Sequence, residues 1–77
     1  MIINIDAPVK QENIKNYLES LEDIKYKYIG TVRRTTLQFE IDEKAFAGDP
    51  IAITKSKIKT GLGNMIVFRV LEDGKNW

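Results

Sequence analysis

Hydrophobic and polar positions alternate with a period of two in the middle of this 77-residue chain. Residues 24–32 place Ile24, Tyr26 and Tyr28 between lysines, and residues 35–42 repeat the alternation with leucine, phenylalanine and isoleucine. This period is typical of a strand with one buried face. We therefore predict two neighbouring antiparallel strands, with their apolar side chains toward the core and their lysines, threonines and acids toward water.

The turn between these strands is predicted at Arg33-Arg34, with Gly30 as the alternative bend. Two-residue hairpin loops favour asparagine and glycine, so a pair of arginines is a poor turn former. The sequence leaves the register of this hairpin open.

A helical period precedes the hairpin, in residues 9–22. Apolar residues recur there at i, i+3, i+4 and i+7, which is the stripe of a helix that lies on a sheet. They are Ile14, Tyr17, Leu18 and Leu21.

Apolar runs open and close the chain. Residues 1–6 predict a short strand, and residues 65–72 predict a strand that is apolar on both faces and more covered than its neighbours. In the closing run, Ile66, Phe68 and Val70 form the expected inner set. Residues 43–48 are predicted to connect, with one helical turn that packs Phe46 against the core.

Residues 51–60 fit two structures. Asp49 as N-cap, Pro50 at the first position and Gly61 as terminator predict a helix. Alternating isoleucines and the threonine content instead predict a strand followed by a turn at 61–64. We favour the helix because both of its ends carry capping residues, and we keep the strand, which gives the order βαββββ, as the alternative.

The favoured order is βαββαβ in a single small α+β domain, residues 1–77. This is the split-βαβ, or ferredoxin-like, plan, in which two helices cover one face of a four-stranded antiparallel sheet. Many unrelated functions use this plan, so the fold does not name one.

Composition narrows the chemistry. The chain has no cysteine and no histidine, which removes disulfides, thiol nucleophiles, thiolate or imidazole metal sites and the commonest general base. No pair of carboxylates has a spacing that predicts a catalytic cleft, and Gly61 and Gly63 follow the predicted helix, whereas a phosphate-binding loop precedes one. We expect no catalytic residues, no metal and no cofactor, and predict that the protein is not an enzyme.

No segment reads as a signal peptide, and no apolar run approaches the roughly 20 residues of a membrane span. We expect a cytoplasmic protein that does not contact membranes.

The net charge of +1 hides a sorting of charges along the chain. Residues 24–39 and 50–69 each carry four basic residues and no acid, whereas residues 1–23 and 40–49 each carry a net charge of −3. Such sorting can steer partners. It can also reflect edge lysines that prevent sheets from pairing.

Two interfaces follow from these patterns. An apolar patch on the open sheet face would bind a protein partner, unless the chain's own tail covers it; its candidate residues are Met65, Val67, Leu71, Ile29 and Trp77. A basic surface would contact nucleic acid; its candidates are Lys25, Lys27, Arg33, Arg34, Lys55, Lys57 and Lys59.

We favour a small non-enzymatic interaction module that acts through the open sheet face or an edge strand, as a homodimer or with a protein partner. The alternative is a regulator that contacts nucleic acid.

Overall fold

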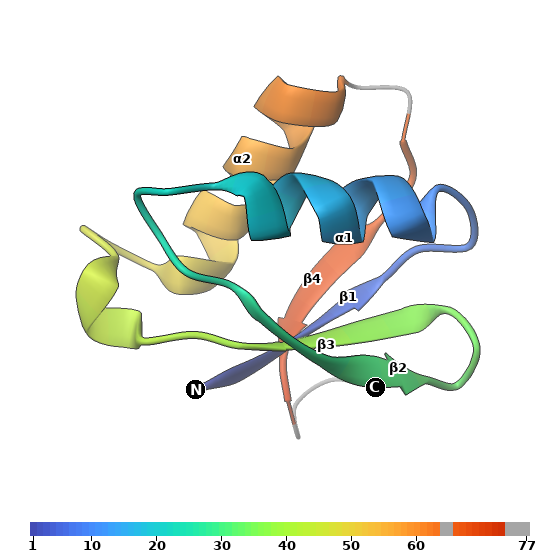
Figure 1. Ribbon diagram of the computed structural model, residues 1–77, viewed down its shortest axis with the longest axis horizontal. Coiled ribbons are helices and arrows are strands. Elements are labelled where there is room, and N and C mark those ends of the chain that lie inside the picture. Colours follow the sequence, from blue (N-terminus) through green and yellow to red (C-terminus); the bar gives the residue numbers. More distant parts are fainter. Residues whose placement is uncertain (64–65, 74–77) are drawn as a thin grey trace.

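The computed structural model describes residues 1–63 and 66–73, and it places a layer of helices on one face of a sheet (Figure 1). The strands are Ile2–Asp6 (β1), Lys27–Val32 (β2), Thr36–Glu40 (β3) and Arg69–Glu72 (β4). The helices are Gln11–Ser20 (α1), the short 3₁₀ turn Glu43–Ala45 (η1) and Pro50–Leu62 (α2).

Within residues 1–63 and 66–73, the sheet has four strands in the order β2-β3-β1-β4, and each neighbouring pair is antiparallel. This order and the two helices confirm the predicted α+β fold and match the ferredoxin-like plan. The alternative strand at residues 51–60 is wrong, because α2 spans this segment. β2 and β4 form the two edges of the sheet.

The core lies between the central strands and the two helices. In the central pair, Ile3 lies opposite Phe39 and Ile5 lies opposite Leu37. These four side chains are buried. Helix α1 adds the fully buried Ile14 and Leu18, and α2 adds Ile58, so the helical stripe and the strand alternation meet in one cluster.

Tyr26 anchors the segment before β2 in this core. Its ring makes edge-on contacts with Phe39 and Phe46, at centroid distances of 6.2 and 6.0 Å. Its hydroxyl shares a buried hydrogen bond of 2.8 Å with the Thr54 hydroxyl of α2. Burial raises the pKa of Tyr26 above its ordinary value. The contact with Phe46 confirms that the segment after β3 packs against the core.

Helix α2 begins as predicted and ends later than predicted. The Asp49 carboxylate accepts a hydrogen bond of 3.0 Å from the Ile51 N–H, and Pro50 takes the first position. The helix passes through Gly61 and ends at Leu62, and its C-cap is Gly63, whose φ of 88° suits glycine. Gly61 has a different role, because a Cβ atom at this position would overlap the ring of Tyr17 on α1. It allows the two helices to approach each other.

Two strands are shorter than predicted because their partners end. β4 begins at Arg69, opposite Asp6, the last residue of β1, so residues upstream of 69 have no strand to pair with. The predicted start at Met65 lies outside the described residues. β2 likewise begins at Lys27, opposite Glu40, the last residue of β3. Helix α1 is also shorter than the predicted 9–22.

The open face of the sheet carries a polar network. Asn4, although fully buried, donates from its amide to the Asp73 carboxylate at 2.9 Å. The Gln38 amide donates to the Asn4 side-chain oxygen at 3.0 Å. An apolar patch therefore does not occupy the centre of this face.

Candidate interaction site along the outer edge of β2

β2 is an edge strand that pairs with β3 alone in the described part of the chain. In an antiparallel ladder about half of an edge strand's N–H and C=O groups point away from its partner. The register shifts between Tyr28 and Gly30, which identifies a bulge at Ile29. The Ile29 side chain is 49% exposed there.

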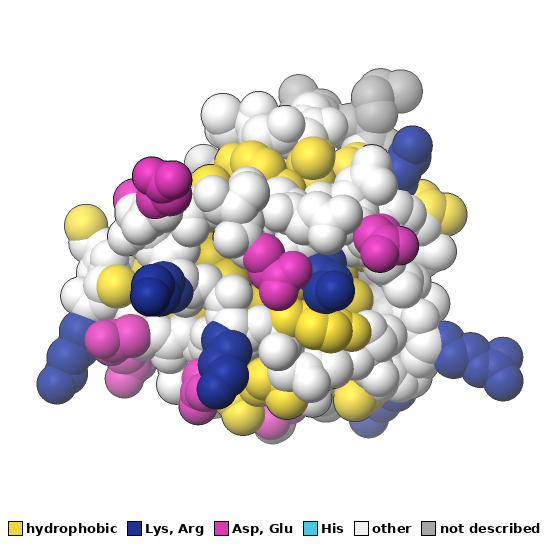
Figure 2. Space-filling model, in the orientation of Figure 1, with side chains coloured by type: hydrophobic (Ala, Val, Ile, Leu, Met, Phe, Trp, Pro, Cys, Tyr) yellow, Lys and Arg dark blue, Asp and Glu magenta, His cyan; other side chains and the backbone are white. Residues whose placement is uncertain are grey.

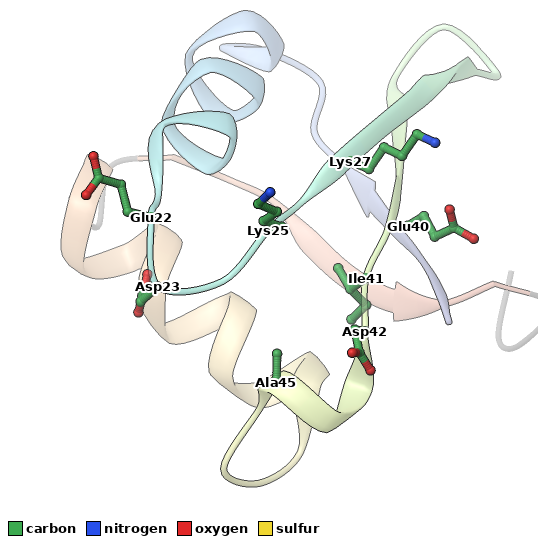
Figure 3. A pocket seen from close by; sticks show the side chains of 8 residues that line it. All are labelled: Glu22, Asp23, Lys25, Lys27, Glu40, Ile41, Asp42 and Ala45. Atoms are coloured by element: carbon green, nitrogen blue, oxygen red, sulfur yellow. The ribbon is translucent and has the colours of Figure 1, made fainter.

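A groove follows this edge, and we call it the β2 groove. Its largest hollow has a volume of about 780 Å³ (Figure 3). Two smaller hollows lie beside the largest one. The second hollow shares Lys25 and Lys27 with the first, and the third hollow shares Tyr28 with the second. The three hollows therefore adjoin one another along β2. In Figure 2, hydrophobic atoms show between acidic and basic side chains in the zone where α1 meets this strand.

The first hollow has an excess of carboxylates, and we call it the acidic cavity. Figure 3 shows that the α1–β2 loop supplies one wall and the segment from β3 to η1 supplies the other. Lys27 and Glu40 extend side by side from neighbouring strands. Its lining residues are Glu22, Asp23, Lys25, Lys27, Glu40, Ile41, Asp42 and Ala45.

One of these four carboxylates already has a cation. The Lys57 ammonium of α2 donates to Asp23 at 2.9 Å, which lowers the pKa of Asp23 and raises that of Lys57. In the described residues, the side chains of Glu22 and Glu40 form no hydrogen bond or ion pair. Lys25 and Lys27 also line the cavity, so that, with Lys57 on Asp23, three cations lie near its four carboxylates.

The middle of the groove is built around Tyr28. Its ring packs on Phe39 at a centroid distance of 5.6 Å, and the Lys15 ammonium of α1 lies 4.6 Å from the ring centroid. Gln11, Thr31 and other residues line the hollow beside it. This part of the groove offers an aromatic surface under a cation.

The far end of β2 is the arginine tip, Arg33 and Arg34, which confirms the predicted position of the turn. Both residues are exposed, and both have left-handed backbone angles, with φ of 52° and 66°. Residues other than glycine and asparagine rarely adopt these angles. In Figure 2, basic side chains project from the end of the molecule where Figure 1 places this turn.

The apolar residues predicted as a partner site do not come together. Ile29 lies on one edge strand, whereas Val67, 70% exposed, precedes β4 at the other edge. Leu71 is half-buried, opposite Asn4. Met65 and Trp77 lie outside the described residues.

The predicted basic surface divides into separate groups. Lys25 and Lys27 line the β2 groove. Helix α2 carries the exposed Lys55 and Lys59, while its Lys57 is bound to Asp23. Figure 1 shows α2 and the β2–β3 turn at different sides of the molecule. The arginine tip and the α2 lysines therefore do not form one continuous surface.

Within residues 1–63 and 66–73, no group of three or more acidic side chains could hold a metal ion. No helix in the same ranges has the length and apolarity needed to cross a bilayer. Comparison of the chain with protein-family models, curated proteins and solved structures found no match. The geometry of the β2 edge is therefore the basis for a functional proposal.

Proposed function

We propose that the protein is a non-enzymatic interaction module that binds an extended protein segment along β2. The observation that supports this proposal is the coincidence of an unpaired strand edge with three adjoining hollows that residues in and just before β2 help to line. Strand addition uses main-chain hydrogen bonds for affinity and neighbouring pockets for specificity.

The side chains of β2 suit this mode of binding. Lys25, Lys27, Ile29 and Thr31 are exposed, and the bulge at Ile29 interrupts their alternation, so that Thr31 lies opposite the core residue Leu37. Lys25 and Lys27 would face acids or carbonyl groups of the added segment, and Ile29 would gain apolar cover. The same lysines disfavour random sheet-to-sheet contact, so a productive partner must supply a matching charge pattern.

The placement of the basic residues supports a protein partner over nucleic acid in this proposal. A nucleic-acid surface needs several cations on one face to neutralise neighbouring phosphates. Here the arginine tip and the α2 lysines lie apart, and one lysine is already paired. This separation favours a protein partner over nucleic acid.

A random dodecapeptide library displayed on phage would test the proposal, with amide NMR of the labelled protein to map the selected peptides. We expect shifts concentrated in β2 and the facing side of α1. Ile29→Lys should weaken binding at least tenfold, because it places a charge at the centre of the edge.

Val67→Lys is the matched control, since it also replaces an exposed β-branched side chain by lysine, here near the other edge. It should leave affinity within about twofold. Shifts that map to β4 or to α2, or equal effects of the two variants, would refute strand addition at β2.

A further inference from the structure

The second and third hollows of the β2 groove differ in their chemistry. Residues of α1 or the loop after it and residues in or just before β2 line each of them, and Tyr28 belongs to both. The second hollow has a volume of about 460 Å³ and the third a volume of about 210 Å³. A segment added to β2 would direct every second side chain toward this side of the sheet.

The second hollow has an apolar floor. Tyr26 is buried there, and Leu21 and Tyr28 are half-buried. Its other lining residues, Glu19, Lys25 and Lys27, are exposed, so their charged ends can stay in water. This hollow therefore suits an apolar side chain, whose burial would remove apolar surface of both molecules from water.

The third hollow contains hydrogen-bond donors that have no acceptor. The hydroxyls of Tyr28 and Thr31 share one hydrogen bond. Because each hydroxyl has one proton, this bond uses one of the two protons and leaves the other for an acceptor. The half-buried Lys15 ammonium lies 4.6 Å from the centroid of the Tyr28 ring and, in the described residues, forms no hydrogen bond or ion pair.

An ammonium group and a hydroxyl proton in one small hollow match a carboxylate, which accepts hydrogen bonds at both of its oxygens. Glu12 also lines the hollow, but its exposed side chain forms no hydrogen bond or ion pair in the described residues and does not occupy these donors. Its charge would oppose a doubly charged phosphate more strongly than a singly charged carboxylate.

The spacing of the two hollows fits one strand. Tyr28 and Thr31 lie opposite the core residues Phe39 and Leu37, so they occupy successive positions on the helix side of β2, and the buried Tyr26 precedes them. The hollows lie in the two intervals between these three residues. One such interval is about two residues of a regular strand, or roughly 7 Å. Side chains i and i+2 of an added strand have this separation, whichever way the strand runs.

From these contacts we infer that the segment received by β2 carries an acidic side chain two residues away from an apolar one. The carboxylate binds Lys15 in the third hollow, and the apolar side chain fills the second. The partner is that of the proposed function, on which this inference rests. The carboxylate belongs to a side chain and not to a chain terminus, since the edge of β2 continues past the third hollow to Val32.

Charge exchange between protein and peptide would test this pairing. The probe is a labelled peptide chosen from the library selection for the acidic and apolar residues at this spacing, and fluorescence anisotropy measures its Kd. We expect at least a tenfold rise in Kd for Lys15→Glu with this peptide, and a similar rise when lysine replaces the acid of the peptide. The Lys15→Glu protein with the lysine peptide should recover most of the affinity, because the two charges are again opposite.

Two controls accompany the exchange. Lys55→Glu makes the same charge change on an exposed position of α2 and should leave the Kd within about twofold. Amidation of the peptide's C-terminus should also leave the Kd within about twofold, which separates a side-chain carboxylate from a terminal one. Thermal unfolding of each variant shows whether the fold persists.

The apolar position has its own arm. Serine in place of the apolar residue of the peptide should raise the Kd at least tenfold, whereas alanine in place of the residue between the two positions should change it by about twofold or less. That intervening side chain points to the other side of the sheet.

The outcomes distinguish this pairing from strand addition itself. Peptides that bind along β2 equally well with glutamate or lysine at the acidic position, or a Lys15→Glu protein that the lysine peptide does not rescue, would overturn the inference and leave strand addition standing. The absence of any peptide that maps to β2 would overturn both.

Discussion

At the scale of single residues, the left-handed backbone angles are informative. In the described part of the chain, the residues other than glycine with positive φ are Lys10, Arg33 and Arg34, and all three are basic. Each such conformation costs on the order of 1–3 kcal/mol, and such residues are concentrated at functional sites. Glycine or asparagine would relieve this cost at the turn.

Arg34→Gly should therefore stabilise the folded chain. We expect the free energy of unfolding to rise by about 1 kcal/mol, because glycine adopts this φ without a steric penalty. Urea titration measures this gain.

Arg34→Ala is the companion variant, since it removes the same charge and retains the backbone strain. It should not raise the free energy of unfolding. Equal stability of the two variants would show that the strain is not relieved by glycine.

The buried hydrogen bond between Tyr26 and Thr54 gives a second prediction at this scale. Thr54→Val should destabilise the protein by about 1–3 kcal/mol, because it leaves a buried tyrosine hydroxyl without a partner. The double variant Tyr26→Phe with Thr54→Val should recover part of this loss, because neither polar group remains.

A double-mutant cycle of urea unfolding measures the coupling between these two positions. Additive effects of the two single substitutions would mean that the hydroxyls do not depend on each other.

At the scale of elements, the contact between α1 and α2 depends on a glycine. Gly61→Ala should displace the Tyr17 ring, because the new Cβ would occupy the space of the ring. The usual helix-propensity gain of about 1 kcal/mol is then offset by lost packing. In a Tyr17→Ala background the same substitution should be stabilising. Thermal unfolding of the four proteins compares the two backgrounds, and the same effect in both would contradict the contact.

The sequence predicted the elements better than their ends. Alternation in the two hairpin strands and the stripe of α1 are local signals, and both are confirmed. The starts of β2 and β4 depend on where β3 and β1 end, so no local pattern encodes them. Gly61 was misassigned as a helix end for a similar reason. Its contact with Tyr17 joins residues that are far apart in the chain.

At the scale of the whole molecule, binding at the β2 edge should appear in the melting temperature. A selected peptide that binds the folded chain should raise Tm as its concentration rises, since mass action favours the bound state. Calorimetry with and without the peptide measures this effect. A Tm that the peptide does not change would contradict binding to the folded chain.

The candidate site could be predicted from the sequence only in part. The sequence indicated the edge lysines and the arginine pair, and it showed that acidic and basic segments alternate. It gave no signal that Glu22 and Glu40 line one cavity, because the fold brings together the end of α1 and the end of β3. Of the predicted apolar patch, Ile29 and Val67 lie near opposite edges of the sheet, whereas Met65 and Trp77 lie outside the described residues.

The short β4 strand has a consequence for how far the sheet can grow. A segment that pairs with β2 occupies one edge of the sheet and leaves β4 as the other edge. Short edge strands are poor templates for further pairing. On this basis, the four residues of β4 limit growth of the sheet at that edge and protect the protein against fibre formation.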